Sequence, residues 1–200
     1  MINKILHSNN VLQTLLEYSV TSLKKKVNTE IDMNYEEEER PIGSYKFHLF
    51  PSRVKEVKKP TLKDVFWSTG TFLFDTKAVT GAGSYQQTIR YDGYKNALRQ
   101  YRDGKYKDIA DMLEILRTRG NISVHCNCPS FLYWGFQYIA SDEDFVWHTK
   151  EKRPPKLRNP IEIGGVCKHI YKVLEEFKGF IPKMGKKIES ELKKRGLDRK

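Results

Sequence analysis

All three cysteines of this 200-residue chain fall in two short motifs, and no other feature of the sequence restricts its folding as strongly. The first motif is the Cys-x-Cys pair Cys126 and Cys128, and the second is the Cys-x-His pair Cys167 and His169. Three thiolates and one imidazole are the soft donor set that tetrahedral Zn²⁺ prefers. The alternative is that the cysteines are merely small buried hydrophobic residues. Because all three lie in the two pairs, the sequence predicts one structural zinc ion that joins two distant segments.

The local sequence suits both halves of this site. Cys126 and Cys128 are two residues apart, so on a strand both side chains point to the same face. Cys167 and His169 can converge on one ion if Cys167 lies at the start of a helix, where backbone N–H groups also stabilise a thiolate. His125 should point to the opposite strand face, so we expect it to be a neighbour of the site and not a ligand.

The predicted zinc shell is closed, which argues against catalysis. A catalytic zinc ion keeps one position open for water, whereas four strong ligands fill the shell. The chain lacks the His-x-Glu and Pro-Cys-x-x-Cys motifs of zinc deaminases and a phosphate-binding Gly-Lys-Ser/Thr loop. A nucleophilic pair of Cys167 and His169 is a competing interpretation, but zinc ligation explains the same residues with fewer assumptions. We therefore expect no catalytic residues and no enzymatic activity.

Charge and hydropathy restrict the partners and the location of the protein. The net charge of +11, with a pI near 9.4, favours contact with a polyanion such as DNA, RNA or an acidic protein surface. Three cysteines cannot all pair with one another, which argues against a disulfide framework. We find no run of roughly 20 apolar residues and no signal peptide pattern at the N-terminus. We therefore expect synthesis in a reducing cytoplasm and no membrane partner.

Hydrophobic periodicity predicts an α+β fold in four parts. These are an N-terminal helix and acidic linker (1–40), a β-rich and helical region (41–120), a zinc module (121–180) with a long insertion, and a basic helical tail (181–200). Alternating or compact apolar runs predict strands at Tyr45–Leu49, Thr71–Phe74, Gln87–Tyr91 and Asn121–Cys126. Helical spacing predicts helices at Val11–Val27, Tyr94–Tyr101, Lys107–Arg119, Ser130–Ala140, Val166–Phe177 and in the tail Pro182–Lys200, with a loop at Ser141–Gly165.

Basic residues gather in the insertion and in the tail. The candidates for contact with a nucleic acid or another partner are Lys152, Arg153, Lys156, Arg158, Lys186, Lys187, Lys193, Lys194 and Arg195. Aromatic side chains of the insertion could stack on bases beside these charges, or could form the core of a small domain. The tail could contact phosphates in a salt-sensitive way, or could dock on an acidic neighbouring subunit. The sequence leaves both pairs of alternatives open.

The two metal-ligand motifs resemble the SWIM-type zinc finger, a small ββα module. The likeness includes the flanking strings Cys-Pro-Ser-Phe at 128–131 and Cys-Lys-His-Ile at 167–170, and it covers roughly Asn121 to Phe177. It implies that one Zn²⁺ is held by the same four residues. The chain departs from the family in the long connection Phe131–Val166 between the motifs.

Short strings at 131–134, 154–160 and 166–169 are similar to SWIM-like proteins of tailed bacteriophages, some of which are virion components. This resemblance implies a zinc-stabilised structural protein of a phage virion, such as a head–tail connector or neck component near the genome. It further implies homo-oligomers, contacts with other virion or assembly proteins, non-specific contact with DNA, and a location in the host cytoplasm and then the virion. One alternative is a nucleic-acid-binding regulatory protein that uses the finger and its insertion. A second is an enzyme subunit with the finger as an accessory module.

Overall fold

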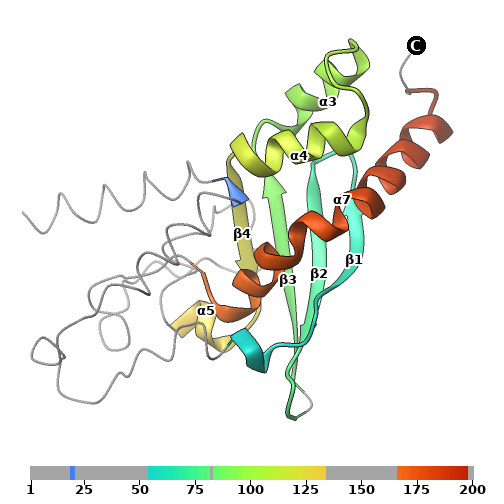
Figure 1. The fold of residues 1–200 in the computed structure, drawn as a ribbon. Coiled ribbons are helices and arrows are strands. Elements are labelled where there is room, and N and C mark those ends of the chain that lie inside the picture. The colour runs from blue at the N-terminus through green and yellow to red at the C-terminus, as the bar shows by residue number, and fades with distance from the viewer. Residues whose placement is uncertain (1–18, 21–53, 82, 134–165, 198–200) are drawn as a thin grey trace, which may run out of the picture.

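A four-stranded antiparallel sheet forms the centre of the protein (Figure 1). The computed structural model describes residues 19–20, 54–81, 83–133 and 166–197. The strands lie in the sheet in their order along the chain: β1 (Thr61–Phe66), β2 (Thr71–Lys77), β3 (Ser84–Tyr91) and β4 (Ile122–Cys126). The helices are the short 3-10 helix η2 (Val54–Glu56) and the α-helices α3 (Tyr94–Arg102), α4 (Ile109–Arg119), α5 (Pro129–Tyr133) and α7 (Lys168–Lys194). The predicted mixture of helices and strands is confirmed.

Helix α7 crosses one face of the sheet (Figure 1). The alternation of side chains along a strand turns Phe72 and Phe74 of β2 toward this face, where both are fully buried. The ring of Phe177 on α7 lies 6.2 Å from that of Phe72, 5.8 Å from that of Phe74 and 5.9 Å from that of Tyr91 on β3. Aromatic clusters of this kind bury a large apolar area. They make the contact between α7 and the sheet the main core of the described structure.

Helices α3 and α4 occupy the connection between β3 and β4. Asp108 caps the start of α4, because its carboxylate accepts a hydrogen bond of 2.7 Å from the backbone N–H of Asp111. The helix ends at Gly120, as its sequence predicts. The C-terminal half of α7 packs on α4, and a Cβ placed on Gly185 would lie 3.5 Å from the backbone nitrogen of Ala110. A residue without a side chain therefore brings the two helices close together.

Most of the elements predicted within the described residues are confirmed. The confirmed strands are those at 71–74, 87–91 and 121–126, and the confirmed helices are those at 94–101 and 107–119. Helix α5 is the described part of the helix predicted at Ser130–Ala140. Strand β1 was not predicted as a separate element. The predicted helix Val166–Phe177 and the predicted tail helix are parts of the single helix α7, which continues through positions 180 and 181.

Several predictions lie outside the described residues. They are the helix Val11–Val27 apart from positions 19 and 20, the acidic linker, the strand Tyr45–Leu49, and the insertion after Tyr133 with its loop. Within the part that is described, no helix has both the length and the apolar character needed to cross a membrane. Strand β4 pairs with β3 and so belongs to the same sheet as β1 and β2.

Candidate metal centre

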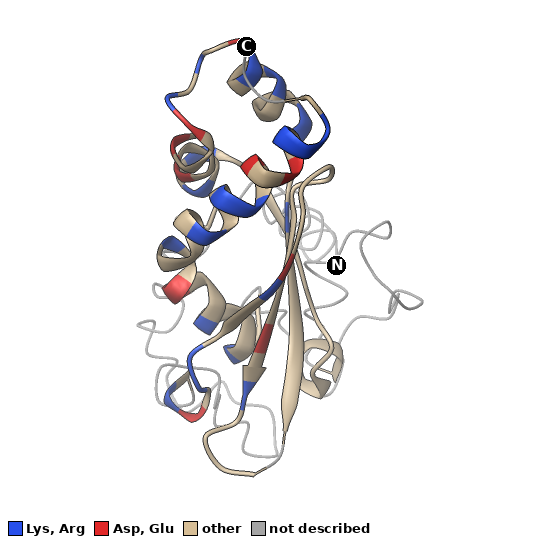
Figure 2. Ribbon diagram, turned by 90° about the vertical axis from the view of Figure 1, so that its right-hand side faces the viewer, with Lys and Arg blue, Asp and Glu red and all other residues tan. Residues whose placement is uncertain are grey.

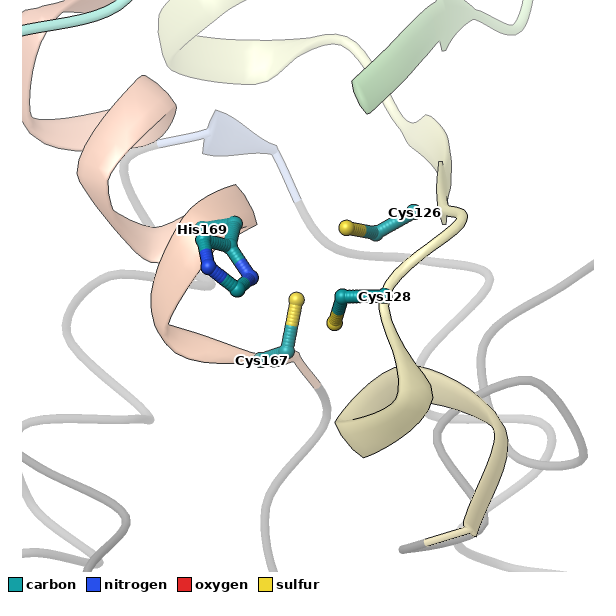
Figure 3. Close-up of side chains that lie close together, drawn as sticks. All are labelled: Cys126, Cys128, Cys167 and His169. Carbon is teal, nitrogen blue, oxygen red and sulfur yellow. The ribbon is translucent and has the colours of Figure 1, made fainter. Parts of the chain in front are cut away.

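The four predicted ligands lie together at the point where the end of β4 meets the start of α7 (Figure 3). One donor atom from each of Cys126, Cys128, Cys167 and His169 lies within 4.8 Å of the other three. The four residues are 2%, 2%, 1% and 4% exposed, respectively. In a tetrahedral zinc site with Zn–S bonds of about 2.3 Å, adjacent sulfurs are about 3.8 Å apart. Small side-chain rotations would therefore close the cluster around an ion.

The Cys-x-Cys motif spans the transition from strand to helix. Cys126 is the last residue of β4, and Cys128 immediately precedes α5. Because the strand has ended, the turn after it, and not the alternation of a strand, brings both thiols to one side. Asn127 ties this turn to β3, since its side-chain oxygen accepts a hydrogen bond of 2.8 Å from the backbone N–H of Gln86. The backbone N–H of Phe131 lies 3.3 Å from the Cys128 sulfur and donates to it.

The Cys-x-His motif forms the start of α7. Cys167 is the N-cap, with φ −79° and ψ 165°, and its side chain makes no capping hydrogen bond. Its thiol is thus available to an ion while it lies beside the positive end of the helix dipole, which favours a thiolate. Between the two ligands, Lys168 forms an ion pair of 2.7 Å with Glu56 of η2. The motif is therefore placed both by the start of α7 and by this ion pair with η2.

His169 has a buried ring nitrogen that needs a partner. Its Nδ1 atom accepts and donates no hydrogen bond within the described residues, although it is shielded from solvent. The ring packs on Tyr85 with centroids 4.6 Å apart, and one of its nitrogens faces the three sulfurs (Figure 3). A buried nitrogen without a partner is costly. Coordination of a metal ion is one way to satisfy it, so this atom and the donor set both fit a metal.

The thiols perturb one another strongly. Burial raises the pKa values of Cys126 and Cys167. Hydrogen bonds with the Cys126 and Cys167 side chains instead hold the pKa of Cys128 far below its ordinary value. Burial thus opposes the ionisation of two of the three thiols. Three simultaneous thiolates in this position require a compensating cation, and a divalent metal ion supplies that charge.

His125 lies next to the ligands in sequence but not in the cluster of donor atoms. It is on β4 directly before Cys126, and its ring packs edge-on against Phe131 with centroids 5.5 Å apart. Adjacent residues of a strand face opposite sides of the sheet. The expectation that His125 is a neighbour and not a ligand agrees with this geometry.

The structure divides the predicted basic contact residues into separate groups. Lys152, Arg153, Lys156 and Arg158 lie outside the described residues. Basic residues recur along α7 (Figure 2), where an open groove of about 510 Å³ is bordered, among the described residues, by Gly179, Pro182, Lys183, Lys186, Lys187 and Ser190. Lys194 and Arg195 instead approach Glu191, at 2.7 Å and 4.0 Å, in the last turn of the helix. Lys183 belongs to the predicted basic tail and also borders this groove.

Gln87 lies beside the cysteines but was not among the predicted site residues. Gln87 is fully buried on β3, and its Nε2 atom lies 3.6 Å from the sulfur of Cys126. The alternation of side chains along β3 could have indicated it. Gln87 lies two residues from both Tyr85 and Ile89, at a position where an inward-facing side chain is expected. A polar side chain at an inward strand position needs a specific partner.

No protein-family model, curated protein sequence or solved structure matches this chain. The assignment of a function therefore depends on the chemistry of its own residues. Of these, the four buried metal-ligand candidates carry the most specific chemical information.

Proposed function

We propose that the protein is a non-enzymatic structural protein in which one Zn²⁺ ion joins the end of β4 to the start of α7. The observation that carries this proposal is the convergence of four buried donor atoms, from two distant segments, to within 4.8 Å of one another. Cys126, Cys128, Cys167 and His169 would hold the ion. The ion would supply the positive charge that three buried thiolates need, and its binding energy would become folding energy.

Two features support a structural role for the ion over a catalytic role. The four donors match the number of ligands in a closed tetrahedral shell, which leaves no open position for water or substrate. All four side chains are almost fully buried, so a substrate has no direct path to the ion through them. The composition Cys₃His is that of structural zinc sites.

The metal content of the purified protein tests the proposal. We expect one zinc ion per chain after purification without chelators, measured by elemental mass spectrometry. Cobalt substitution should yield the intense visible absorption of tetrahedral Co²⁺ and the near-ultraviolet charge-transfer bands of thiolate ligands. Cys128→Ser should lose both spectra and most of the bound zinc, whereas Ser130→Ala, two residues away, should keep them. A native protein that is metal-free and fails to take up cobalt would contradict the proposal.

We further propose that the metal centre belongs to a SWIM-like module of a phage virion protein, such as a head–tail connector. The pairing of β3 with β4, followed by α7, is compatible with a ββα arrangement, although α3 and α4 separate the two strands in sequence. The short phage-like strings in the sequence support the virion role. Light scattering coupled to gel filtration should find a defined homo-oligomer, and electron microscopy should show rings. A protein that stays monomeric at high concentration would speak against a connector.

A second candidate function, contact with nucleic acid, is favoured by the groove on α7. Three lysines border it, and none of its described lining residues is acidic. Lys187 also lies 3.8 Å from a carboxylate oxygen of Asp64 on β1. Surface lysines attract the phosphate backbone without regard to base sequence. This activity is compatible with a structural protein near a packaged genome, and also with a nucleic-acid-binding regulatory protein.

A further inference from the structure

Gln87 occupies an inward position of the sheet that would suit an apolar residue. Its partners across the sheet are Phe74 on β2 and Cys126 on β4. The side chain has no exposed surface. Burial of an amide is unfavourable unless its polar atoms find partners, so an amide at this position needs a reason.

The donor side of the amide is fully engaged. Nε2 lies 2.8 Å from the backbone oxygen of Tyr85, 2.9 Å from Oγ1 of Thr76 and 3.6 Å from Sγ of Cys126. The carbonyl oxygen of Tyr85 can only accept, so the amide must direct its nitrogen, and not its oxygen, toward this group. Nε2 has two protons for three acceptors. A metal-bound thiolate is a stronger acceptor than a neutral hydroxyl, so the sulfur should take the larger share of the second proton.

The acceptor side of the amide is unsatisfied. Oε1 is buried and has no hydrogen-bond partner within the described residues. A leucine or methionine would fill the same inward position without this cost. At this position, the hydrogen bonds donated by Nε2 must therefore outweigh the free-energy cost of burying the unpaired Oε1 atom.

We propose that Gln87 is a positioning residue of the metal centre, whose Nε2–H donates a hydrogen bond to the Cys126 thiolate. This inference rests on the proposed zinc-binding function. The N–H···S bond would orient the sulfur toward the ion and disperse part of its negative charge. Partners of this kind orient metal ligands, and their loss typically lowers metal affinity. Gln87 thereby links the metal centre to β2 and β3, through Thr76 and Tyr85.

Nuclear magnetic resonance of the native protein tests this directly. In ¹⁵N-labelled protein loaded with ¹¹³Cd²⁺, we expect a scalar coupling between the cadmium nucleus and a side-chain amide proton of Gln87, transmitted through the N–H···S bond. The same sample reports the ligands, because cysteine and histidine protons also couple to the metal. A sample with Cys₃His coupling and no coupling to Gln87 would overturn this inference alone. A protein that takes up no cadmium would overturn the zinc proposal as well.

Matched substitutions provide the second measurement. Gln87→Met keeps the length of the side chain but removes the donor, and it should lower zinc affinity roughly 10–100-fold in competition with a chromophoric chelator. It should also shift the thiolate-to-cobalt charge-transfer bands, which a change in packing alone would not do. Gln86→Met, at the neighbouring exposed position, should leave both unchanged. Thr76→Val removes the other side-chain partner of Nε2 but keeps the N–H···S bond, so it should retain the native spectrum.

Native affinity and native bands in Gln87→Met would contradict the proposal. The same losses in Thr76→Val as in Gln87→Met would also contradict it, because they would trace the effect to packing. If Gln87→Met fails to fold, the cadmium coupling in the native chain decides the question.

Discussion

Two of the four buried side-chain atoms that lack a hydrogen-bond partner within the described residues lie at the metal centre. They are Nδ1 of His169 and Oε1 of Gln87, and the other two are the hydroxyl groups of Tyr91 and Tyr94. Buried polar atoms without partners are uncommon, and each one points to a cost accepted for another purpose. In the proposed metal centre, ligation of the ion would account for the first atom, and the hydrogen bond donated by Nε2 of Gln87 would account for the second. The ligand set and its support therefore form one unit.

Among the described glycines, Gly70 leaves the least room for a side chain. It lies in the turn between β1 and β2 with φ +69°, and a Cβ there would stand 2.2 Å from Cγ of Tyr94. Gly93 has nearly the same φ, +68°, but no atom within 4 Å of its Cβ position. Substitutions at Gly70 and Gly93 therefore separate the cost of backbone strain from the cost of steric overlap with Tyr94.

We expect Gly93→Ala to lower the free energy of unfolding by about 1–2 kcal/mol, the cost of a left-handed conformation. Gly70→Ala should lower it by several kcal/mol, since the new methyl group must also displace the buried ring of Tyr94. Urea denaturation followed by circular dichroism measures both values. Equal losses in the two variants would show that the Tyr94 ring moves aside freely.

At the scale of elements, α7 connects the candidate metal centre to helix α4. Its N-cap Cys167 and its residue His169 are candidate ligands, its middle packs on the sheet, and its second half packs on α4. Pro182 lies inside the helix, where a proline removes one hydrogen bond and usually bends or ends the helix. The helix nevertheless continues, because Met184, Ile188 and Leu192 are buried beyond the proline.

Gly185 and Gly179 form a matched test of the contact between α7 and α4. Gly185→Leu should destabilise the protein by about 1–3 kcal/mol, because its side chain must enter the space beside Ala110. Gly179→Leu should have no such cost and should gain helix propensity, since nothing lies within 4 Å of its Cβ position. Urea denaturation of both variants gives the comparison. A loss of stability in Gly179→Leu alone would contradict this packing.

The groove on α7 makes a separate prediction about DNA. We expect salt-sensitive binding of a duplex of arbitrary sequence, measured by fluorescence anisotropy across a range of salt concentrations. Lys183→Glu with Lys186→Glu should weaken binding and lower the slope of log affinity against log salt by about 2, because each phosphate contact contributes about 1. Lys58→Glu with Lys59→Glu changes the net charge equally at exposed positions outside the groove. Equal effects of the two double variants would indicate attraction by net charge and no specific role for α7.

At the scale of the whole molecule, the metal centre is continuous with the principal core. Cys126 and Cys167 belong to the same cluster of buried residues as Phe72 and Phe177. The ion would therefore stabilise the sheet and α7 together, and not only a small peripheral finger. Unfolding of the described part should then be cooperative.

Removal of the metal tests this cooperativity. Excess chelator should lower the melting temperature of the native protein in a single transition, because zinc would bind only the folded state and shift the equilibrium toward it. Hydrogen exchange should rise both at the start of α7 and in β2 and β3. Loss of protection confined to the ligand segments would show that the metal stabilises only its own loops. Cys128→Ser, already without bound zinc, should not respond to the chelator.

The amino-acid sequence was sufficient to determine the features that depend on neighbouring residues. The candidate ligands could be selected because donor type and short spacing are local properties. The end of α4 followed from Gly120, whereas the helix begins at Ile109 and not at the predicted Lys107. Strand β2 was predictable from a compact apolar run, and β3 was predictable from the alternation of its residues. A proline usually ends a helix, so the sequence around Pro182 predicted two separate helices where α7 is continuous.

Only the tertiary structure decided which segments meet. It places Cys128 beyond the end of β4, so that a turn and not a strand aligns the two thiols, and it places Gln87 opposite Cys126. It also shows that burial against α4 carries the helix past Pro182. These features depend on contacts between residues far apart in the chain, and the periodicity of a segment shows which face is buried but not what buries it.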